Sequence, residues 1–245
     1  MSELGLRVAA DGLEMHGRAE VVSQMCVPGS STLRTSVFAT WADVLSGAVA
    51  GQALNPRIPL TLDLEVQLHD GARQGDQIAA VATAVKIGRT VLVCETRFRN
   101  ERTGALAALA YVSFIASPDP RHVFPDGFPS LAHISGQLTE PLAERIGSRT
   151  VAPGTVEVPR RPDGLNASGA IQGGIVAFAA EEAGISLVGR SVVAEALTVR
   201  YLRPIMIGPG RATAEVHGSL AVVRIADAGA GKLTTLATAR LVDAD

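Results

Sequence analysis

The stretch Asn166-Ala-Ser-Gly-Ala-Ile-Gln172-Gly173-Gly174, continued by Ile175-Val-Ala-Phe-Ala-Ala-Glu181, decides the fold of this chain. A turn of small residues leads directly into an apolar helix, and the first backbone N–H groups of a helix have no partner within it. These N–H groups and the helix dipole together favour an anion at that end. The acid Glu181 follows about two turns further along the helix. The stretch therefore has the outline of a binding site.

A weaker copy of this stretch occurs early in the chain, at Pro28-Gly-Ser-Ser-Thr-Leu-Arg34-Thr35-Ser36, followed by Val37-Phe-Ala-Thr-Trp41-Ala-Asp43. Arg34 to Asp43 and Gln172 to Glu181 both span nine positions. The strand expected after each helix is repeated too, at 60–68 and at 193–201, with an offset of 133 residues against 138 at the helix. A period well above 100 residues indicates duplicated domains and not a solenoid.

The periodicity predicts the same order of elements in both halves. Apolar residues at three- and four-residue spacing predict helices at 34–51 and 170–185. Alternating residues predict strands at 6–9, 17–27, 60–68, 77–86, 89–99 and 106–116 in the first half, and near 154–158, 193–201, 218–224 and 231–239 in the second. We expect an N-terminal domain at 1–117, a Pro-rich linker at 118–130 and a C-terminal domain at 131–245 that begins with a short amphipathic segment at 137–146.

Composition excludes several classes of protein. The 245 residues are 47% apolar, so neither a disordered nor a fibrous chain is expected. Dispersed basic residues, a net charge of −2 and 4% aromatics argue against a nucleic-acid partner. No apolar run reaches the ~18 residues that span a bilayer and no signal peptide is recognised, so we expect a cytoplasmic protein without a membrane partner. We expect Cys26 and Cys94 to be buried thiols.

One helix wrapped by an antiparallel sheet, with Asn-x-x-Gly-x-x-(His or Gln)-Gly-Gly and an acid nine positions later, resembles the hotdog fold of the PaaI-like acyl-CoA thioesterases. The second half matches this motif at Asn166, Gly169, Gln172, Gly173, Gly174 and Glu181, with Gln for the usual His and Glu for the usual Asp. The first half keeps the acid as Asp43 and has Pro28, Ser31, Arg34 and Thr35 at the other positions. The resemblance implies an α+β fold, with two hotdog domains paired as a pseudo-dimer.

Geometry predicts that each helix acid serves the other helix. An acid eight residues past the helix start lies ~12 Å from it, too far to act on a carbonyl bound there. Two composite sites follow. The resemblance adds a Ser or Thr at the start of the strand after the helix, which is Thr61 in the first half and is replaced by Ala194 in the second. One site combines Asp43 and Thr61 with the second half's Asn166, Gln172 and Gly173, and is complete. The other combines Arg34 and its neighbours with Glu181 and Ala194, and we interpret it as a degraded second site.

The resemblance implies hydrolysis of an acyl-CoA thioester to the free acid and CoA. The backbone N–H of Gly173 would stabilise the oxyanion, and Asp43 would act as general base or nucleophile, two roles that the sequence leaves open. Thr61 would orient water, Asn166 and Gln172 would hold the acyl carbonyl or the carboxylate, and Gly174 would contact the substrate. Arg34 would either bind a phosphate of CoA or face solvent.

Other functions and partners remain open at this point. A non-catalytic acyl-CoA-binding hotdog protein is the main alternative. A hydratase is disfavoured because no His occupies either helix start, and His122-Val-Phe-Pro125 lies in the linker. We predict no cofactor and no metal, since the histidines are dispersed, at His16, His69, His122, His133 and His217. The chain is expected to be a monomer or a homo-oligomer, such as a dimer of tandem hotdogs.

Overall fold

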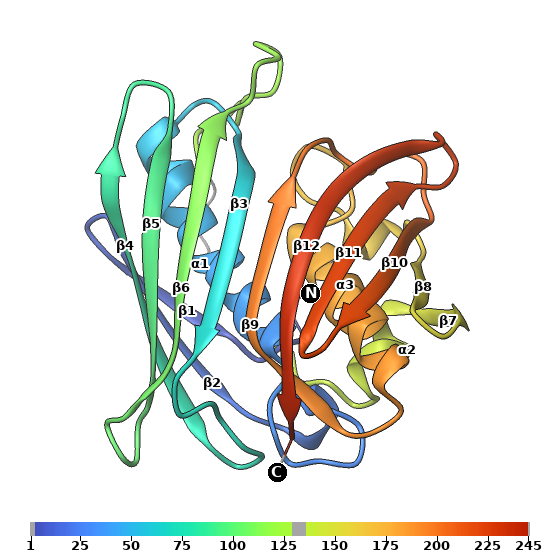
Figure 1. Cartoon of the computed structure of the whole chain (residues 1–245). Helices are drawn as coiled ribbons and strands as arrows, with labels where there is room; N and C mark the ends of the chain where they lie inside the picture. The colour runs from blue at the N-terminus through green and yellow to red at the C-terminus, as the bar shows by residue number, and fades with distance from the viewer. Residues whose placement is uncertain (1–2, 129–135, 245) are drawn as a thin grey trace.

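The two halves of the sequence form one continuous antiparallel sheet in the computed structural model, which describes residues 3–128 and 136–244 (Figure 1). The first half contains β1 (Arg7–Asp11), β2 (Glu14–Glu20), α1 (Thr35–Leu54), β3 (Pro59–Leu68), β4 (Gln77–Ile87), β5 (Leu92–Asn100) and β6 (Leu106–Ala116). The second contains α2 (Leu142–Ile146), β7 (Arg149–Ala152), β8 (Thr155–Val158), α3 (Gly173–Val188), β9 (Val192–Tyr201), β10 (Gly210–His217), β11 (Leu220–Asp227) and β12 (Lys232–Asp243). Two short 3₁₀ helices, η1 (Ser23–Met25) and η2 (Pro162–Gly164), precede α1 and α3.

The strand order shows the duplication directly. It reads β1-β2-β4-β5-β6-β3 in the first half and continues as β9-β12-β11-β10-β8-β7, so that each strand of one half has its counterpart at the mirrored place. β3 and β9 pair antiparallel at the centre, from Asp63 opposite Arg200 to Gln67 opposite Ala196. Alternation along these two strands directs Leu64 and Val199 into the core, where both are fully buried. The two halves therefore share one sheet and one core.

Each long helix lies against the inner face of its own half of the sheet (Figure 1). Phe38, Trp41 and Leu45 of α1 and Phe178 of α3 are at most 1% exposed. Both helices are apolar on most sides, as expected of helices enclosed by a sheet and by each other. The predicted α+β architecture of two helix-and-sheet units is confirmed.

Helix α1 is long and apolar enough, by length and composition, to cross a membrane, contrary to the expectation that no apolar run reaches this length. Its most apolar window has a mean hydropathy of 1.2, and 67% of that window is buried inside the fold. We interpret α1 as a core helix of the first half.

The expected elements agree with the structure except at some ends and at two strands. The helices are Thr35–Leu54 and Gly173–Val188, each shifted by a few residues from prediction. The segment 137–146 is helical only over Leu142–Ile146. β7 and β10 were not predicted. The predicted linker is described only as far as Phe128, and residues 129–135 lie outside the described part.

The loop between β9 and β10 is held by the buried carboxylate of Asp227. Its Oδ2 accepts the N–H groups of Met206 and Ile207 at 2.9 Å each, and its Oδ1 accepts those of Gly208 and Ala230 at 2.9 and 3.2 Å. Burial alone would raise the pKa of Asp227, but these four donors lower it below its usual value. The loop matters because it reaches the segment before α3.

Asp227→Asn is expected to lower the free energy of unfolding by about 1–3 kcal/mol, because an amide nitrogen would then face backbone N–H groups in a buried place. A depressed pKa stabilises the fold above the unfolded-state pKa, so the difference from wild type should shrink as pH falls through the acid range. Urea unfolding measures both effects. Asp11→Asn, at an exposed position of β1, is the control, and equal midpoints for the two variants would contradict this role.

Candidate active site

Asp43, in the third turn of α1, is held by a hydroxyl from the neighbouring strand. Thr61 Oγ1 donates to Asp43 Oδ1 at 2.9 Å. Thr61 lies where the pairing of β3 with β6 shifts register, between Thr61 and Asp63. Burial raises the pKa of Asp43 to about 6, and the bond from Thr61 acts against this rise. The result is a fixed carboxylate that titrates near neutral pH.

The carboxylate of Asp43 lies beside the first residue of the other half's helix. A Cβ placed on Gly173 would be 2.8 Å from Asp43 Oδ2, and one placed on Gly174 would be 2.3 Å from Thr40 Oγ1. Side chains at these two positions would therefore push α1 and α3 apart. The two glycines are needed for this close approach, which brings an acid of the first half to the helix start of the second.

Two backbone donors are left without an acceptor at this helix start. The carbonyl oxygen of Gln172 accepts the N–H groups of Ile175 and Val176 at 3.0 and 3.2 Å. No side chain caps the helix, and within residues 3–128 and 136–244 the N–H groups of Gly173 and Gly174 donate to no acceptor. A carboxylate and two unpaired N–H groups thus meet at the contact between the halves.

Gln172 and Asn166 take different places around this point. The carboxamide of Gln172 is half-buried and makes no hydrogen bond within the part of the chain that the structure describes. Asn166 is exposed, and its Oδ1 accepts the N–H groups of Ser168 and Ala170 and the hydroxyl of Ser168. Asn166 therefore shapes the loop before α3 through its Oδ1, and its predicted contact with the substrate stays a prediction.

The corresponding place at the start of α1 is filled by protein groups. Glu181, fully buried, accepts the N–H of Thr35 at 2.9 Å through Oε1 and the hydroxyl of Ser36 at 2.5 Å through Oε2. The hydroxyl of Thr35 in turn donates to the carbonyl oxygen of Ala194 at 2.5 Å. Because Glu is one methylene longer than Asp, Glu181 reaches the helix start and caps it, whereas Asp43 makes no such bond to α3.

Arg34 completes this filling and does not face solvent. Its side chain is 2% exposed, and Nη1 lies 2.7 Å from Glu182 Oε2 and 3.7 Å from Glu181 Oε2. The guanidinium also lies 5.1 Å from the ring centroid of Phe178. Burial raises the pKa of Glu181, and the charge of Arg34 opposes this. The expectation of a solvent-facing Arg34 is wrong, and its guanidinium is engaged inside the protein instead of lying open to a phosphate.

Tyr201 is part of the site and was not predicted. Its hydroxyl donates to the carbonyl oxygen of Gly173 at 2.9 Å. Burial raises its pKa well above the usual value, and the nearby charge of Asp43 adds to this. The sequence did contain a signal for this residue. When the two halves are aligned, Tyr201 corresponds to Leu68, so a polar aromatic residue takes the place of an apolar one.

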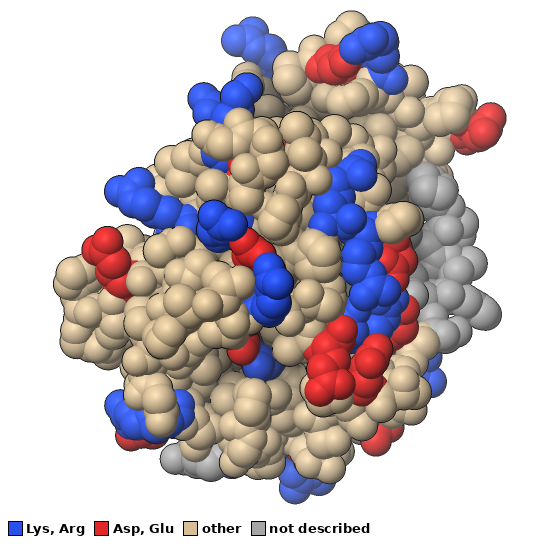
Figure 2. Space-filling model, turned by 90° about the vertical axis from the view of Figure 1, so that its right-hand side faces the viewer, with Lys and Arg blue, Asp and Glu red and all other residues tan. Residues whose placement is uncertain are grey.

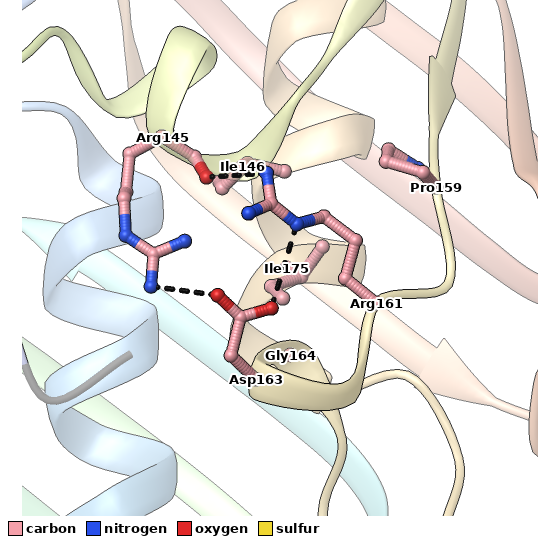
Figure 3. Close-up of a pocket in the computed structure, with 7 residues that line it drawn as sticks. All are labelled: Arg145, Ile146, Pro159, Arg161, Asp163, Gly164 and Ile175. Atoms are coloured by element: carbon pink, nitrogen blue, oxygen red, sulfur yellow. Dashed lines mark hydrogen bonds and ion pairs between the residues drawn. The ribbon is translucent and has the colours of Figure 1, made fainter.

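A small pocket is lined in part by η2, and Figure 3 shows Asp163 between Arg145 and Arg161 within it. The pocket is lined by Arg145, Ile146, Pro159, Arg161, Asp163, Gly164 and Ile175. Asp163 lies 2.9 Å from Arg145 and 3.4 Å from Arg161. A volume of about 10 Å³ has room for about one water molecule. The pocket includes neither Asp43 nor Gly173, and we assign it a structural role beside α3.

Charge on the face of the second half that carries β7, β8 and α2 is mixed. Figure 2 shows basic and acidic groups interspersed among uncharged residues on this face.

Within the described residues no group of three His, Cys, Asp or Glu side chains is placed to hold a metal, and His133 lies outside them. Cys26 and Cys94 are free and buried, as predicted, and burial raises the pKa of both thiols.

The comparisons with known proteins are consistent with this architecture. Residues 32–107 match the family described as "Thioesterase superfamily", a segment that runs from just before α1 into β6. The better copy of the helix-start motif lies outside that segment, in the second half. A search of curated proteins gives no significant match.

Several solved structures share the fold over nearly the whole chain. The 12:0-ACP thioesterase from Umbellularia californica has a TM-score of 0.67 and 12% identity, covering 96% of this chain and 99% of its own. An acyl-ACP thioesterase from Bacteroides thetaiotaomicron has a TM-score of 0.63 and 10% identity, covering 94% and 98%. The tesB protein of Mycobacterium avium subspecies paratuberculosis has 0.62 and 13%, covering 96% and 95%. The chain therefore has the hotdog fold in both halves, and its residues 32–107 carry the sequence pattern of the thioesterase superfamily.

Proposed function

We propose that this chain is a thioesterase that hydrolyses acyl-CoA to the free acid and CoA at one composite site between its two halves. The observation that carries the proposal is the position of Asp43, on α1, against the unpaired N–H groups at the start of α3. The match to the thioesterase superfamily supports thioester hydrolysis as the class of reaction.

The geometry supports a specific division of labour. The N–H groups of Gly173 and Gly174 would receive the thioester oxygen as negative charge develops on it, and the positive end of the helix dipole would add to this. As a general base, Asp43 would take a proton from water while the water oxygen bonds to the carbonyl carbon. The C–S bond then breaks and the thiolate of CoA takes up a proton. As a nucleophile, Asp43 would instead attack the carbonyl carbon and expel the thiolate of CoA, which takes up a proton, and water would hydrolyse the resulting anhydride to the free acid and the Asp43 carboxylate.

Thr61 and Gln172 would assist Asp43 and the helix N–H groups in this reaction. Thr61 was expected to orient water, and its hydroxyl donates to Asp43 Oδ1. In this proposal it would also orient the carboxylate, whose Oδ2 lies near Gly173. The carboxamide of Gln172, at the last position before α3, would hold the acyl carbonyl or the attacking group.

The start of α1 provides no second working site in this proposal. Its Thr35 N–H, the counterpart of the Gly173 N–H, donates to Glu181, and Arg34 pairs with Glu182, so protein groups already occupy this donor and the space beside it. One chain would therefore act with one site. The proposal extends to a cytoplasmic location and to a monomer or a dimer of tandem hotdogs.

Steady-state hydrolysis of a panel of thioesters tests the proposal, with released thiol as the signal. The panel runs from acetyl-CoA to palmitoyl-CoA, includes aryl-CoA esters, and adds acyl-ACP because two similar structures are acyl-ACP thioesterases. Turnover of at least one acyl-CoA is expected. Turnover of acyl-ACP alone would replace CoA as the carrier, and binding of acyl-CoA without turnover of any thioester would favour the non-catalytic acyl-CoA-binding protein.

The rate is expected to depend on pH through Asp43. Its pKa of about 6 means that the carboxylate is ionised above this pH and protonated below it, and only the ionised form accepts a proton or attacks. The value of kcat/KM should therefore rise with pH to a plateau, with an apparent pKa near 6. A profile from about pH 4.5 to about pH 9 measures this, and a plateau that persists down to the lowest pH would contradict it.

A further inference from the structure

Tyr201 lies beside the same glycine as Asp43 and binds its carbonyl oxygen. Its hydroxyl donates to the carbonyl oxygen of Gly173 at 2.9 Å. A Cβ on Gly173 would lie 3.2 Å from this hydroxyl and 2.8 Å from Asp43 Oδ2. Tyr201 is the last residue of β9, so a strand of the second half fixes the backbone where the first half supplies its acid.

The bond from Tyr201 acts on one of the two unpaired donors. The carbonyl of Gly173 and the N–H of Gly174 belong to one planar peptide unit, so a bond that fixes the direction of the carbonyl also fixes the direction of the N–H. This matters because two consecutive glycines have more backbone freedom than other residues. A hydrogen bond to the carbonyl also polarises the peptide unit and makes its N–H a stronger donor.

The start of α1 is the corresponding position in the first half, and it lacks both the tyrosine and the two glycines. When the two halves are aligned, Leu68 corresponds to Tyr201, and Thr35 and Ser36 correspond to Gly173 and Gly174. At that helix start the N–H of Thr35 is already bonded to Glu181. The tyrosine, the two glycines and an unpaired N–H at the first helical residue thus occur together in the second half, whereas the first half has Leu68, Thr35 and Ser36 there and a bonded Thr35 N–H.

We propose that Tyr201 is a positioning residue, whose hydroxyl orients and polarises the Gly173–Gly174 peptide so that the Gly174 N–H receives the developing thioester oxyanion. This role rests on the proposed hydrolysis of acyl-CoA. It is distinct from the role of Asp43, because Tyr201 touches the backbone of the site and not the reacting atoms.

Tyr201→Phe removes only the hydroxyl, and the chain offers a matched control because it has two tyrosines. Tyr111 is exposed and donates to Glu95 Oε2 at 3.0 Å, on the outer side of the first half's sheet. Tyr201→Phe is expected to lower kcat about tenfold and to change KM by less than about twofold, because the lost effect belongs to the transition state. Tyr111→Phe should leave both constants at the wild-type values.

A second measurement separates this inference from the proposed activity. In ¹⁵N-labelled protein, Tyr201→Phe should shift the amide resonance of Gly174 and speed its hydrogen exchange, and Tyr111→Phe should not. If the wild type hydrolyses no thioester, the proposed function fails, and these amide changes still report whether Tyr201 orders the peptide. Unchanged amide resonances, or an unchanged kcat in an active enzyme, would overturn the positioning role.

Discussion

Arg34→Met is expected to lower the free energy of unfolding by about 3–5 kcal/mol, the cost typical of removing one partner from a buried ion pair. Arg34 is 2% exposed, and the variant would leave the fully buried carboxylate of Glu181 without its neighbouring cation. Glu182 is also deprived of its partner, but at 16% exposure it retains some contact with water. The measurement is chemical unfolding in urea at neutral pH.

The pH dependence of this loss has a definite sign. Without Arg34 the pKa of Glu181 should rise further above its unfolded value, since the charge of Arg34 is what opposes the effect of burial. A raised carboxyl pKa means that stability falls as pH rises through the range between the unfolded and folded values. The deficit of Arg34→Met should therefore be smaller at about pH 5 than at about pH 8.

Two further variants define the outcome for Arg34. Arg34→Met combined with Glu181→Gln should recover part of the lost stability, because the uncompensated charge is gone. Arg18→Met removes an exposed arginine whose Nε lies 2.9 Å from Glu101, and should change stability by less than about 1 kcal/mol. Equal losses for Arg34→Met and Arg18→Met would show that the internal ion pairs do not hold the halves together.

The fold could be predicted from the sequence because the pattern is regular and occurs twice. The alternation at 60–68 and its copy at 193–201 identified the two central strands, β3 and β9. The nine-residue spacing from Arg34 to Asp43, repeated from Gln172 to Glu181, aligned the two helices. The distance along a helix then predicted that each acid lies at the start of the other helix, because this argument needs only the helical rise.

The details of the site depend on the reach and direction of side chains, which no local pattern contains. Glu181 caps the start of α1 because its side chain is one methylene longer than that of Asp43. Which backbone N–H this longer side chain reaches depends on how the two halves pack. The expectation that Arg34 faces solvent was wrong because its partners, Glu181 and Glu182, are remote in sequence. Asn166 was predicted to hold the substrate, which stays a prediction, and the bonds from its own loop to its Oδ1 could not be read from the sequence pattern.

Asp43→Asn is expected to lower kcat/KM at least about 10²-fold, because an amide neither accepts a proton nor attacks the thioester. The same variant should raise the free energy of unfolding at neutral pH. Burial raises the pKa of Asp43 to about 6, so ionisation at pH 7 acts against the folded state. Removal of this charge should contribute roughly 2 kcal/mol, with partial solvent screening allowed for. Loss of activity together with a gain in stability would exclude misfolding as the cause.

The account places the working acid in the first half of the chain and gives the matching acid of the second half a structural role. Glu181→Gln is the matched control, since the amide oxygen retains an acceptor for the Thr35 N–H and Arg34 keeps Glu182 as its partner. The decisive measurement is kcat/KM on the best acyl-CoA of the panel for wild type, Asp43→Asn and Glu181→Gln side by side. The account predicts a loss of at least about 10²-fold in Asp43→Asn and a value within about threefold of wild type in Glu181→Gln. Activity retained in Asp43→Asn and lost in Glu181→Gln would contradict the single composite site.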